Sequence, residues 1–237
     1  MLLLWRLLFG HFLADFTFQP DYINAWKRST LLGMLVHCFI HPIVYALLVY
    51  PFLGETWLEN EWGGFTGWQC VFFIFLLHLA EDWLRALAIR RYRQLDNAWC
   101  FLWDQIVHFA AIFLFVPVGA LANGENGVIP EAWPVIGVLL VLVTHGGAIM
   151  IYYLEKDLFG SGFPSLWEKR LGMGERLVLC LLCMLPGGGW IVLAAGWLWL
   201  MYHARARRIF ESSRFSLAAG ACMALACGVA GRALLSG

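Results

Sequence analysis

Four pairs of ionisable side chains, each pair spaced four residues apart, lie within the first four hydrophobic segments of the chain. The pairs are His11/Asp15, His37/His41, His78/Asp82 and Asp104/His108. Residues four apart lie on the same face of a helix. Imidazole and carboxylate groups are costly to bury in hydrocarbon, so their presence in a membrane segment indicates a functional site. We predict that these eight side chains form one metal centre.

The donor atoms of these side chains indicate the kind of ion. Neutral imidazole nitrogens and carboxylate oxygens suit zinc, manganese or ferrous iron, and no cysteine shares the helix-face pattern. We therefore predict one or two divalent ions per chain, with zinc as the first choice. Such an ion lowers the pKa of bound water and polarises a carbonyl or phosphoryl oxygen. The pattern thus predicts a hydrolase that acts on an ester, an amide or a phosphoester.

The carboxylates and their neighbours suggest individual roles. The candidate catalytic residues are Asp15, Asp82 and Asp104, because a carboxylate that does not bind the ion can act as a base. Gln19 and Gln105 continue or adjoin the same polar rows, where an amide can orient a ligand or donate to a developing oxyanion. Arg85, three residues after Asp82, is a candidate for binding an anionic group of the substrate. Cytoplasmic charge that sets the topology explains the same arginine without a ligand.

The composition indicates an integral membrane protein. The chain has 237 residues, of which 61% are hydrophobic and 14% charged. Its apolar runs mostly reach the roughly 20 residues that a spanning helix needs, and they lie at about 1–19, 31–53, 66–90, 100–121, 133–154, 176–202 and 213–235. We predict an all-α, polytopic bundle of six or seven transmembrane helices in a single domain, 1–237. Its parts are a four-helix His/Asp core at 1–121 and C-terminal helices at 133–235.

Charged loops predict the orientation of these helices. Lys27 and Arg28 follow the first segment and further basic clusters follow the third and fifth, whereas the loops at 54–65 and 122–132 carry glutamates and no Lys or Arg. The positive-inside rule then places the N-terminus outside and all four pairs in the cytoplasmic half. Antiparallel neighbours can bring the pairs together at one depth. We expect a membrane lipid or a lipid-linked, membrane-proximal substrate at the cytoplasmic leaflet.

The segment 176–202 is open to two interpretations. Pro186 and the three glycines after it interrupt the segment and leave flanks that are each too short to span a bilayer. A kinked crossing would leave Arg205 and Arg214 outside, against the charge rule. A re-entrant hairpin would return them to the cytoplasm, and we favour it.

Other classes of function fit parts of the pattern. Interhelical hydrogen bonds explain a single buried pair, but four pairs at matching depth favour a shared site. A proton- or metal-ion transporter is the alternative to the hydrolase, although the apolar outer halves of the four segments favour a closed pocket. A haem or di-iron protein is a third class, but the Glu-x-x-His signature of di-iron bundles is absent. The zero net charge and the lack of a basic tail give no sign of a nucleic-acid partner, and the sequence leaves a homo-oligomer or a protein partner open.

The spacing of the polar residues resembles a known family. His11-Phe-Leu-Ala-Asp15-Phe-Thr-Phe-Gln19, the second pair, His78-x-x-x-Asp82 and Asp104-Gln105-x-x-His108 are similar over about residues 1–120 to a bacterial membrane family known as domain of unknown function 3307. A more distant similarity connects the pairs with membrane-bound metal-dependent hydrolases of the bacterial damage response. The resemblance implies a multi-pass protein of the bacterial inner membrane. It supports hydrolysis without naming a substrate, because the family is uncharacterised.

Overall fold

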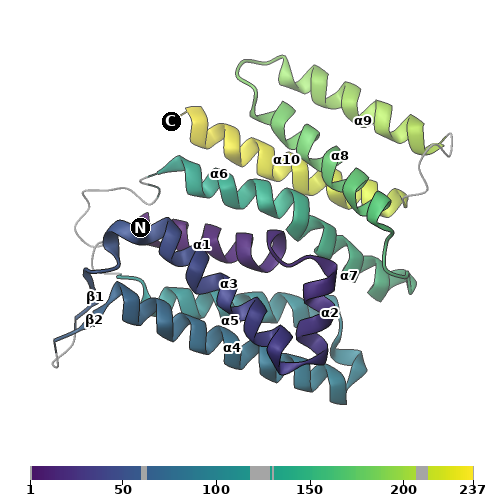
Figure 1. Ribbon diagram of the computed structural model, residues 1–237. Coiled ribbons are helices and arrows are strands. Elements are labelled where there is room, and N and C mark those ends of the chain that lie inside the picture. The colour runs from purple at the N-terminus through teal and green to yellow at the C-terminus, as the bar shows by residue number, and fades with distance from the viewer. Residues whose placement is uncertain (1, 60–62, 118–128, 130, 207–212, 237) are drawn as a thin grey trace. The chain divides into compact units, whose positions relative to one another are not determined.

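The computed structural model describes residues 2–59, 63–117, 129, 131–206 and 213–236. In this part of the chain the fold is all-α apart from one short antiparallel pair of strands, β1 (Thr56–Leu58) and β2 (Phe65–Thr66). The chain divides into two compact units, Met1–Val135 and Ile136–Gly237. Figure 1 shows the helices of both units.

Four long helical segments build unit 1. In chain order its helices are α1 (Leu2–Phe12) continued by the π-helix η1 (Leu13–Thr17), the short α2 (Asp21–Ser29), α3 (Leu31–Val49) with the 3-10 turn η2 (Tyr50–Phe52), α4 (Gly67–Arg91), the 3-10 turn η3 (Arg93–Leu95) and α5 (Ala98–Phe115). Helix α1 contacts α3 and α5, and α4 also contacts both of these helices. Figure 1 shows the four long segments side by side, with the short α2 following η1. The four segments therefore enclose a common interior.

Capping residues determine where these helices begin. The Thr30 hydroxyl accepts a hydrogen bond from the backbone N–H of Gly33 at the start of α3, and the Asn97 side chain accepts one from Cys100 at the start of α5. Thr66 forms a capping box at the start of α4. Such caps satisfy backbone N–H groups that lack a partner in the first turn. They therefore fix the depth at which the polar pairs of α3, α4 and α5 enter the interior.

The first helix is interrupted at one of its polar residues. The π-helix η1 spans Leu13–Thr17 and contains Asp15, and the helix ends at its cap residue Phe18. A sequence pattern based on 3.6 residues per turn predicts an uninterrupted helix over this stretch. Short π-helical insertions are frequent at functional sites, where they reposition a side chain. Here the insertion presents the Asp15 carboxylate to the interior.

An apolar core fills one half of unit 1. Its buried members are Leu4, Leu7, Tyr45, Val49, Leu53, Trp57, Cys70, Val71, Ile74, Ile112 and Val116. They come from the beginnings of α1 and α4, the ends of α3 and α5, and the connection that carries the two strands. None of them is acidic or basic. The polar pairs of the same helices lie at the opposite half.

Unit 2 is built from antiparallel helices. Helix α6 (Ala132–Val141) leads through the π-helix η5 (Leu142–Gly146) into α7 (Gly147–Phe159), followed by α8 (Leu166–Met184), α9 (Trp190–Ala206) and α10 (Arg214–Ser236). The break predicted at Pro186 separates α8 from α9. Arg232 donates hydrogen bonds to the carbonyls of Leu185 (2.6 Å) and Gly187 (2.5 Å) in this turn. The structure thus forms a helical hairpin here, and re-entry into the membrane remains a prediction.

Four helices among the described residues are long and apolar enough to cross a membrane. They are Leu31–Phe52, Ala98–Phe115, Ala132–Phe159 and Arg214–Ser236. This indicates a membrane protein. The predicted spans at 1–19, 66–90 and 176–202 are not among the four. The first, α1 with η1, has 11 and 5 residues and is too short. The second carries several charged residues of α4, and the third is split into α8 and α9.

Candidate metal centre

The four helices of unit 1 bring all eight predicted side chains into one buried cluster. The relative exposure of each of these residues is 5% or less, and three of the histidines are fully buried. The imidazole rings adjoin one another, with ring centroids 3.8 Å apart for His41 and His78 and 4.1 Å apart for His78 and His108. The structure therefore places the sequence-predicted residues together at one depth, as helix spacing predicts.

Asp15 lies at the centre of this cluster. Its Oδ1 is 3.2 Å from His37 Nε2, 3.5 Å from His41 Nε2 and 4.0 Å from His78 Nε2. Its Oδ2 is 3.5 Å from His11 Nε2 and 3.9 Å from His108 Nδ1. One carboxylate thus contacts five imidazoles from four helices. Asp15 is a buried residue of η1.

One subset of the cluster could hold a metal ion. Asp15, His37, His41 and His78 each offer a ligand atom, and these atoms all lie within 4.8 Å of one another. Both ring nitrogens of His41 and Nε2 of His78 are buried without a hydrogen-bond partner among the described residues. Buried polar atoms normally have a hydrogen-bond partner. These nitrogens are therefore expected to bind a group other than the described residues. Three imidazole nitrogens and one carboxylate oxygen fit a divalent ion such as zinc.

Three further groups of potential ligands overlap with this subset. They are His11/His78/His108, Cys38/His78/Asp82 and Glu81/Asp82/Asp104/His108. Two of the groups include residues that the sequence pattern did not assign as ligands, Cys38 and Glu81. Glu81 Oε2 lies 2.9 Å from His108 Nε2, and the Glu81 side chain is 18% exposed. Glu81 therefore connects the buried cluster with its surroundings.

The predicted amide and arginine neighbours differ in their placement. Gln105 Nε2 donates to Asp15 Oδ2 and Asp104 Oδ2, both at 3.0 Å, and its Oε1 lies 3.1 Å from His11 Nε2. Arg85 Nη1 donates to Asp104 Oδ2 at 3.3 Å. Gln19 lies beyond the end of η1, and its Oε1 is buried without a hydrogen-bond partner among the described residues.

Lys27 is a member of the cluster that sequence reasoning missed, since it was interpreted as a topology-setting charge. Its Nζ donates to Asp82 Oδ2 at 2.9 Å and lies 3.1 Å from His37 Nε2. Burial disfavours the charged ammonium, but the attraction of Asp82, Asp15 and Asp104 outweighs burial and raises the pKa of Lys27 above 10.5. Ile23, four residues earlier, is also buried, and this spacing was the signal that could have identified Lys27.

Counted with ionised carboxylates and neutral imidazoles, the formal charges of the cluster do not cancel. The carboxylates of Asp15, Glu81, Asp82 and Asp104 face the cations of Lys27 and Arg85. With neutral imidazoles this leaves a formal charge of −2 among these side chains. An uncompensated buried charge is expensive. A single divalent cation would balance it.

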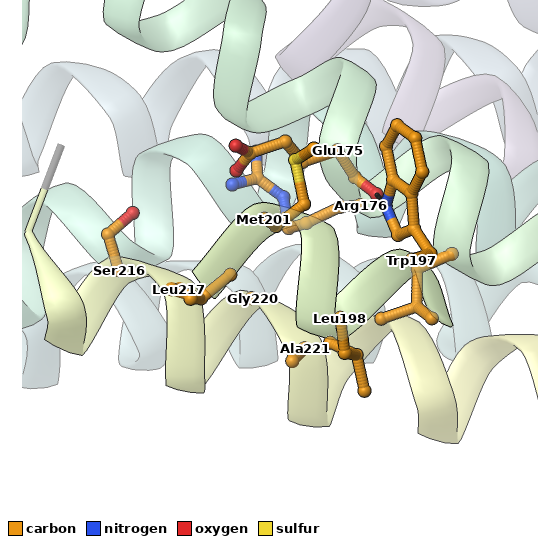
Figure 2. A pocket seen from close by; sticks show the side chains of 10 residues that line it. Glu175, Arg176, Trp197, Leu198, Met201, Ser216, Leu217, Gly220 and Ala221 are labelled. Atoms are coloured by element: carbon orange, nitrogen blue, oxygen red, sulfur yellow. Dashed lines mark hydrogen bonds between the residues drawn. The ribbon is translucent and has the colours of Figure 1, made fainter. Parts of the chain in front are cut away.

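Unit 2 contains a different group of buried charges. Arg176 donates to the carbonyls of Val143 (2.7 Å) and Thr144 (3.0 Å) in η5, while Arg205 pairs with Glu175 at 2.5 Å. Figure 2 shows Glu175 and Arg176 at a pocket whose other walls come from α9 and α10. All four ligand groups found among the described residues lie in unit 1. The charged side chains described in unit 2 thus form no such ligand group.

Comparison with known proteins gives a family without a function. Neither a curated protein nor a solved structure matches the chain. A family model matches residues 3–130, which is more than half of the chain and includes all eight side chains of the cluster. The resemblance to domain of unknown function 3307 is thereby confirmed. The chain belongs to the family described as protein of unknown function (DUF3307).

Proposed function

We propose that unit 1 holds a divalent metal ion, with zinc as the first choice, and uses it for hydrolysis at the cytoplasmic leaflet of a bacterial inner membrane. The substrate is a lipid-linked or membrane-proximal ester, amide or phosphoester. The observation that carries the proposal is the buried set Asp15, His37, His41 and His78, with ligand atoms within 4.8 Å of one another. The −2 charge among the neighbouring side chains supports one divalent ion per chain.

The surroundings of this set support a catalytic centre. Zinc that catalyses hydrolysis is usually held by three protein ligands, which leaves a position for water or substrate. The three imidazoles can supply these ligands, while Asp15, which also contacts His11 and receives a hydrogen bond from Gln105, can act as the base. A bound divalent ion would supply an acidic water and polarise the substrate oxygen.

Two partly exposed side chains give the cluster a route to its surroundings. The side chains of Glu81 and Arg85 are 18% and 15% exposed, respectively, and each contacts a buried member of the cluster. Glu81 can carry a proton between His108 and the outside. Arg85 can attract an anionic group such as a phosphate. Both side chains lie on α4 and contact residues of α5, so we expect the substrate to approach from the side of these two helices.

The apolar half of unit 1 supports hydrolysis over transport. A transporter needs polar or charged groups along a path through both halves of the bilayer. Among the described residues of unit 1, the buried charged side chains all belong to the cluster. The other half holds the partly buried Arg6, which is paired with Glu131 at 2.7 Å. Proteoliposomes containing the protein should therefore show no zinc or proton flux above that of empty vesicles, and a metal-dependent flux would favour the transporter.

Elemental analysis tests the metal centre directly. The full-length protein, purified in detergent without chelators, should contain about one divalent ion per chain. His41→Ala should lose most of this metal, whereas His203→Ala, a histidine of α9 outside the four ligand groups, should retain it. The absence of metal after purification and zinc reconstitution would contradict the proposal. A screen of the zinc-loaded protein against lipid esters, amides and phosphoesters then tests hydrolysis, with His41→Ala as the inactive control.

A further inference from the structure

A lysine ammonium lies among side chains of the kinds that bind metal ions. Lys27 Nζ is 2.9 Å from Asp82 Oδ2 and 3.1 Å from His37 Nε2, and these last two atoms are 3.1 Å from each other. An imidazole nitrogen and a carboxylate oxygen at this separation could belong to one coordination sphere. The ammonium thus lies where a metal ion could bind, next to the ligand set of Asp15, His37, His41 and His78.

The two cation positions share one side chain. His37 Nε2 lies 3.2 Å from Asp15 Oδ1 on one side and 3.1 Å from Lys27 Nζ on the other. Hydrolases with two metal ions hold them about 3.5–4 Å apart. Because Nε2 has a single lone pair, His37 could ligate only one of two such ions, and Asp82 would be the ligand left for the second. In this protein, the Lys27 ammonium occupies the second position of such a pair.

Packing holds Lys27 at this position. Within α2, the neighbouring Arg28 pairs with Asp96 at 3.2 Å, and Arg90 donates to the Arg28 carbonyl at 2.9 and 2.5 Å. At Gly33 of α3, an added Cβ would lie 2.5 Å from the backbone of Trp26. Helix α2 is therefore tied to α3 and to the connection between α4 and α5, so Lys27 is directed inward by a fixed helix.

The formal charge of the cluster, with ionised carboxylates and neutral imidazoles, agrees with the binding of one divalent metal ion. Four carboxylates and two cations leave −2, which one divalent ion neutralises and two would overcompensate. Replacing Lys27 by glutamate would bring the formal charge to −4 and add a ligand. Two divalent ions would then be balanced.

We propose that this centre takes one divalent ion and that the Lys27 ammonium stands in the place of a second. This inference rests on the proposed metal centre. It assigns Lys27 to the binding machinery and implies that Lys27 limits the centre to one ion.

Zinc stoichiometry in three forms of the full-length protein tests this assignment. Each form is saturated with zinc, desalted and subjected to elemental analysis. The wild type should hold one ion, and Lys27→Glu should hold two. Arg28→Glu makes the same change of charge at the next residue, which pairs with Asp96 rather than with the cluster, and it should hold one. In addition, Lys27→Met should bind its first ion at least tenfold more tightly, because a competing cation is removed.

The possible results separate the two proposals. One ion in wild type with one in Lys27→Glu and unchanged affinity in Lys27→Met would overturn the assignment of Lys27 and leave the metal centre intact. Two ions in the wild type would also overturn the assignment of Lys27. No ion in wild type would overturn the metal centre itself. If Lys27→Glu does not fold, the affinity of Lys27→Met decides alone.

Discussion

Replacing the central carboxylate should abolish most of the metal affinity. Asp15→Asn preserves the shape of the side chain but removes the charge that contacts five imidazoles at 3.2–4.0 Å. It also changes the formal charge of the cluster from −2 to −1. Loss of a side chain that only supports a ligand weakens metal binding about 10–100-fold. Asp15 is a ligand or the base beside the ion, so we expect the upper end, about 100-fold or about 2.7 kcal/mol.

Thermal unfolding with and without zinc measures this change. At a free zinc concentration of about 100 times the wild-type Kd, binding should stabilise the wild type by about 2.7 kcal/mol. A 100-fold weaker variant should gain only about 0.4 kcal/mol under the same conditions. Asp96→Asn is the matched control, because Asp96 pairs with Arg28 outside the cluster, and its zinc response should equal that of wild type. A full zinc response in Asp15→Asn would refute the role assigned to this carboxylate.

Three further substitutions test interactions that stabilise the two units. Gly33→Ala should destabilise unit 1 by about 1–3 kcal/mol, because the new methyl group meets the backbone of α2 at 2.5 Å, whereas Gly54→Ala, with open space at its Cβ, should unfold at the wild-type temperature. The hydrogen bonds from Arg6 lower the pKa of Glu131 from 4.5, so this pair stabilises the protein above pH 4.5 and its contribution is lost as the pH falls through the lowered pKa. Glu131→Gln should therefore reduce the acid sensitivity of thermal unfolding, and an unchanged pH profile would contradict this. Arg176→Met leaves two carbonyls of η5 without their donor and should cost about 2–3 kcal/mol of stability, yet elemental analysis should find the wild-type metal content.

Helix periodicity was sufficient to predict that the eight paired side chains lie close together. Each pair occupies one helix face. The pairs of the first and third long segments lie toward the C-terminal ends of these segments, and the pairs of α3 and α5 lie nearer to their N-terminal ends. In antiparallel neighbours these positions meet at the same end of unit 1. Only the spacing of four and the antiparallel arrangement of neighbours are needed for this prediction. It therefore remained valid although α1 contains a π-helical insertion.

Periodicity failed where the backbone leaves the ideal helix. Gln19 was expected to continue the row of His11 and Asp15, but the helix ends at Phe18, so the periodicity does not extend to it. Nothing in the local residue types predicts the π-helix over Leu13–Thr17, because its geometry depends on packing in the interior. The sequence predicted that Asp15 enters the cluster but not that it would become its centre.

Charges near the membrane boundary were the second source of error. Lys27 has two compatible explanations in the sequence, as a topology signal and as a buried partner, and the positive-inside rule favours the first. Its pairing with Asp82 depends on the position of α2 against α3 and α4, which are distant in the sequence. Glu81 directly precedes Asp82, and adjacent residues on a helix point about 100° apart, so the spacing of the pairs does not place Glu81 in the cluster. In the structure it reaches His108 on the neighbouring helix.

Anomalous X-ray diffraction from zinc-loaded crystals tests the central claim most directly. We predict a difference peak at the zinc edge that is enclosed by His37, His41, His78 and Asp15, with nitrogen ligands at about 2.0–2.1 Å. Its position should lie beside the Lys27 ammonium. A crystal grown with zinc that shows no peak in this cluster, with the imidazoles hydrogen-bonded to one another instead, would contradict the proposed metal centre.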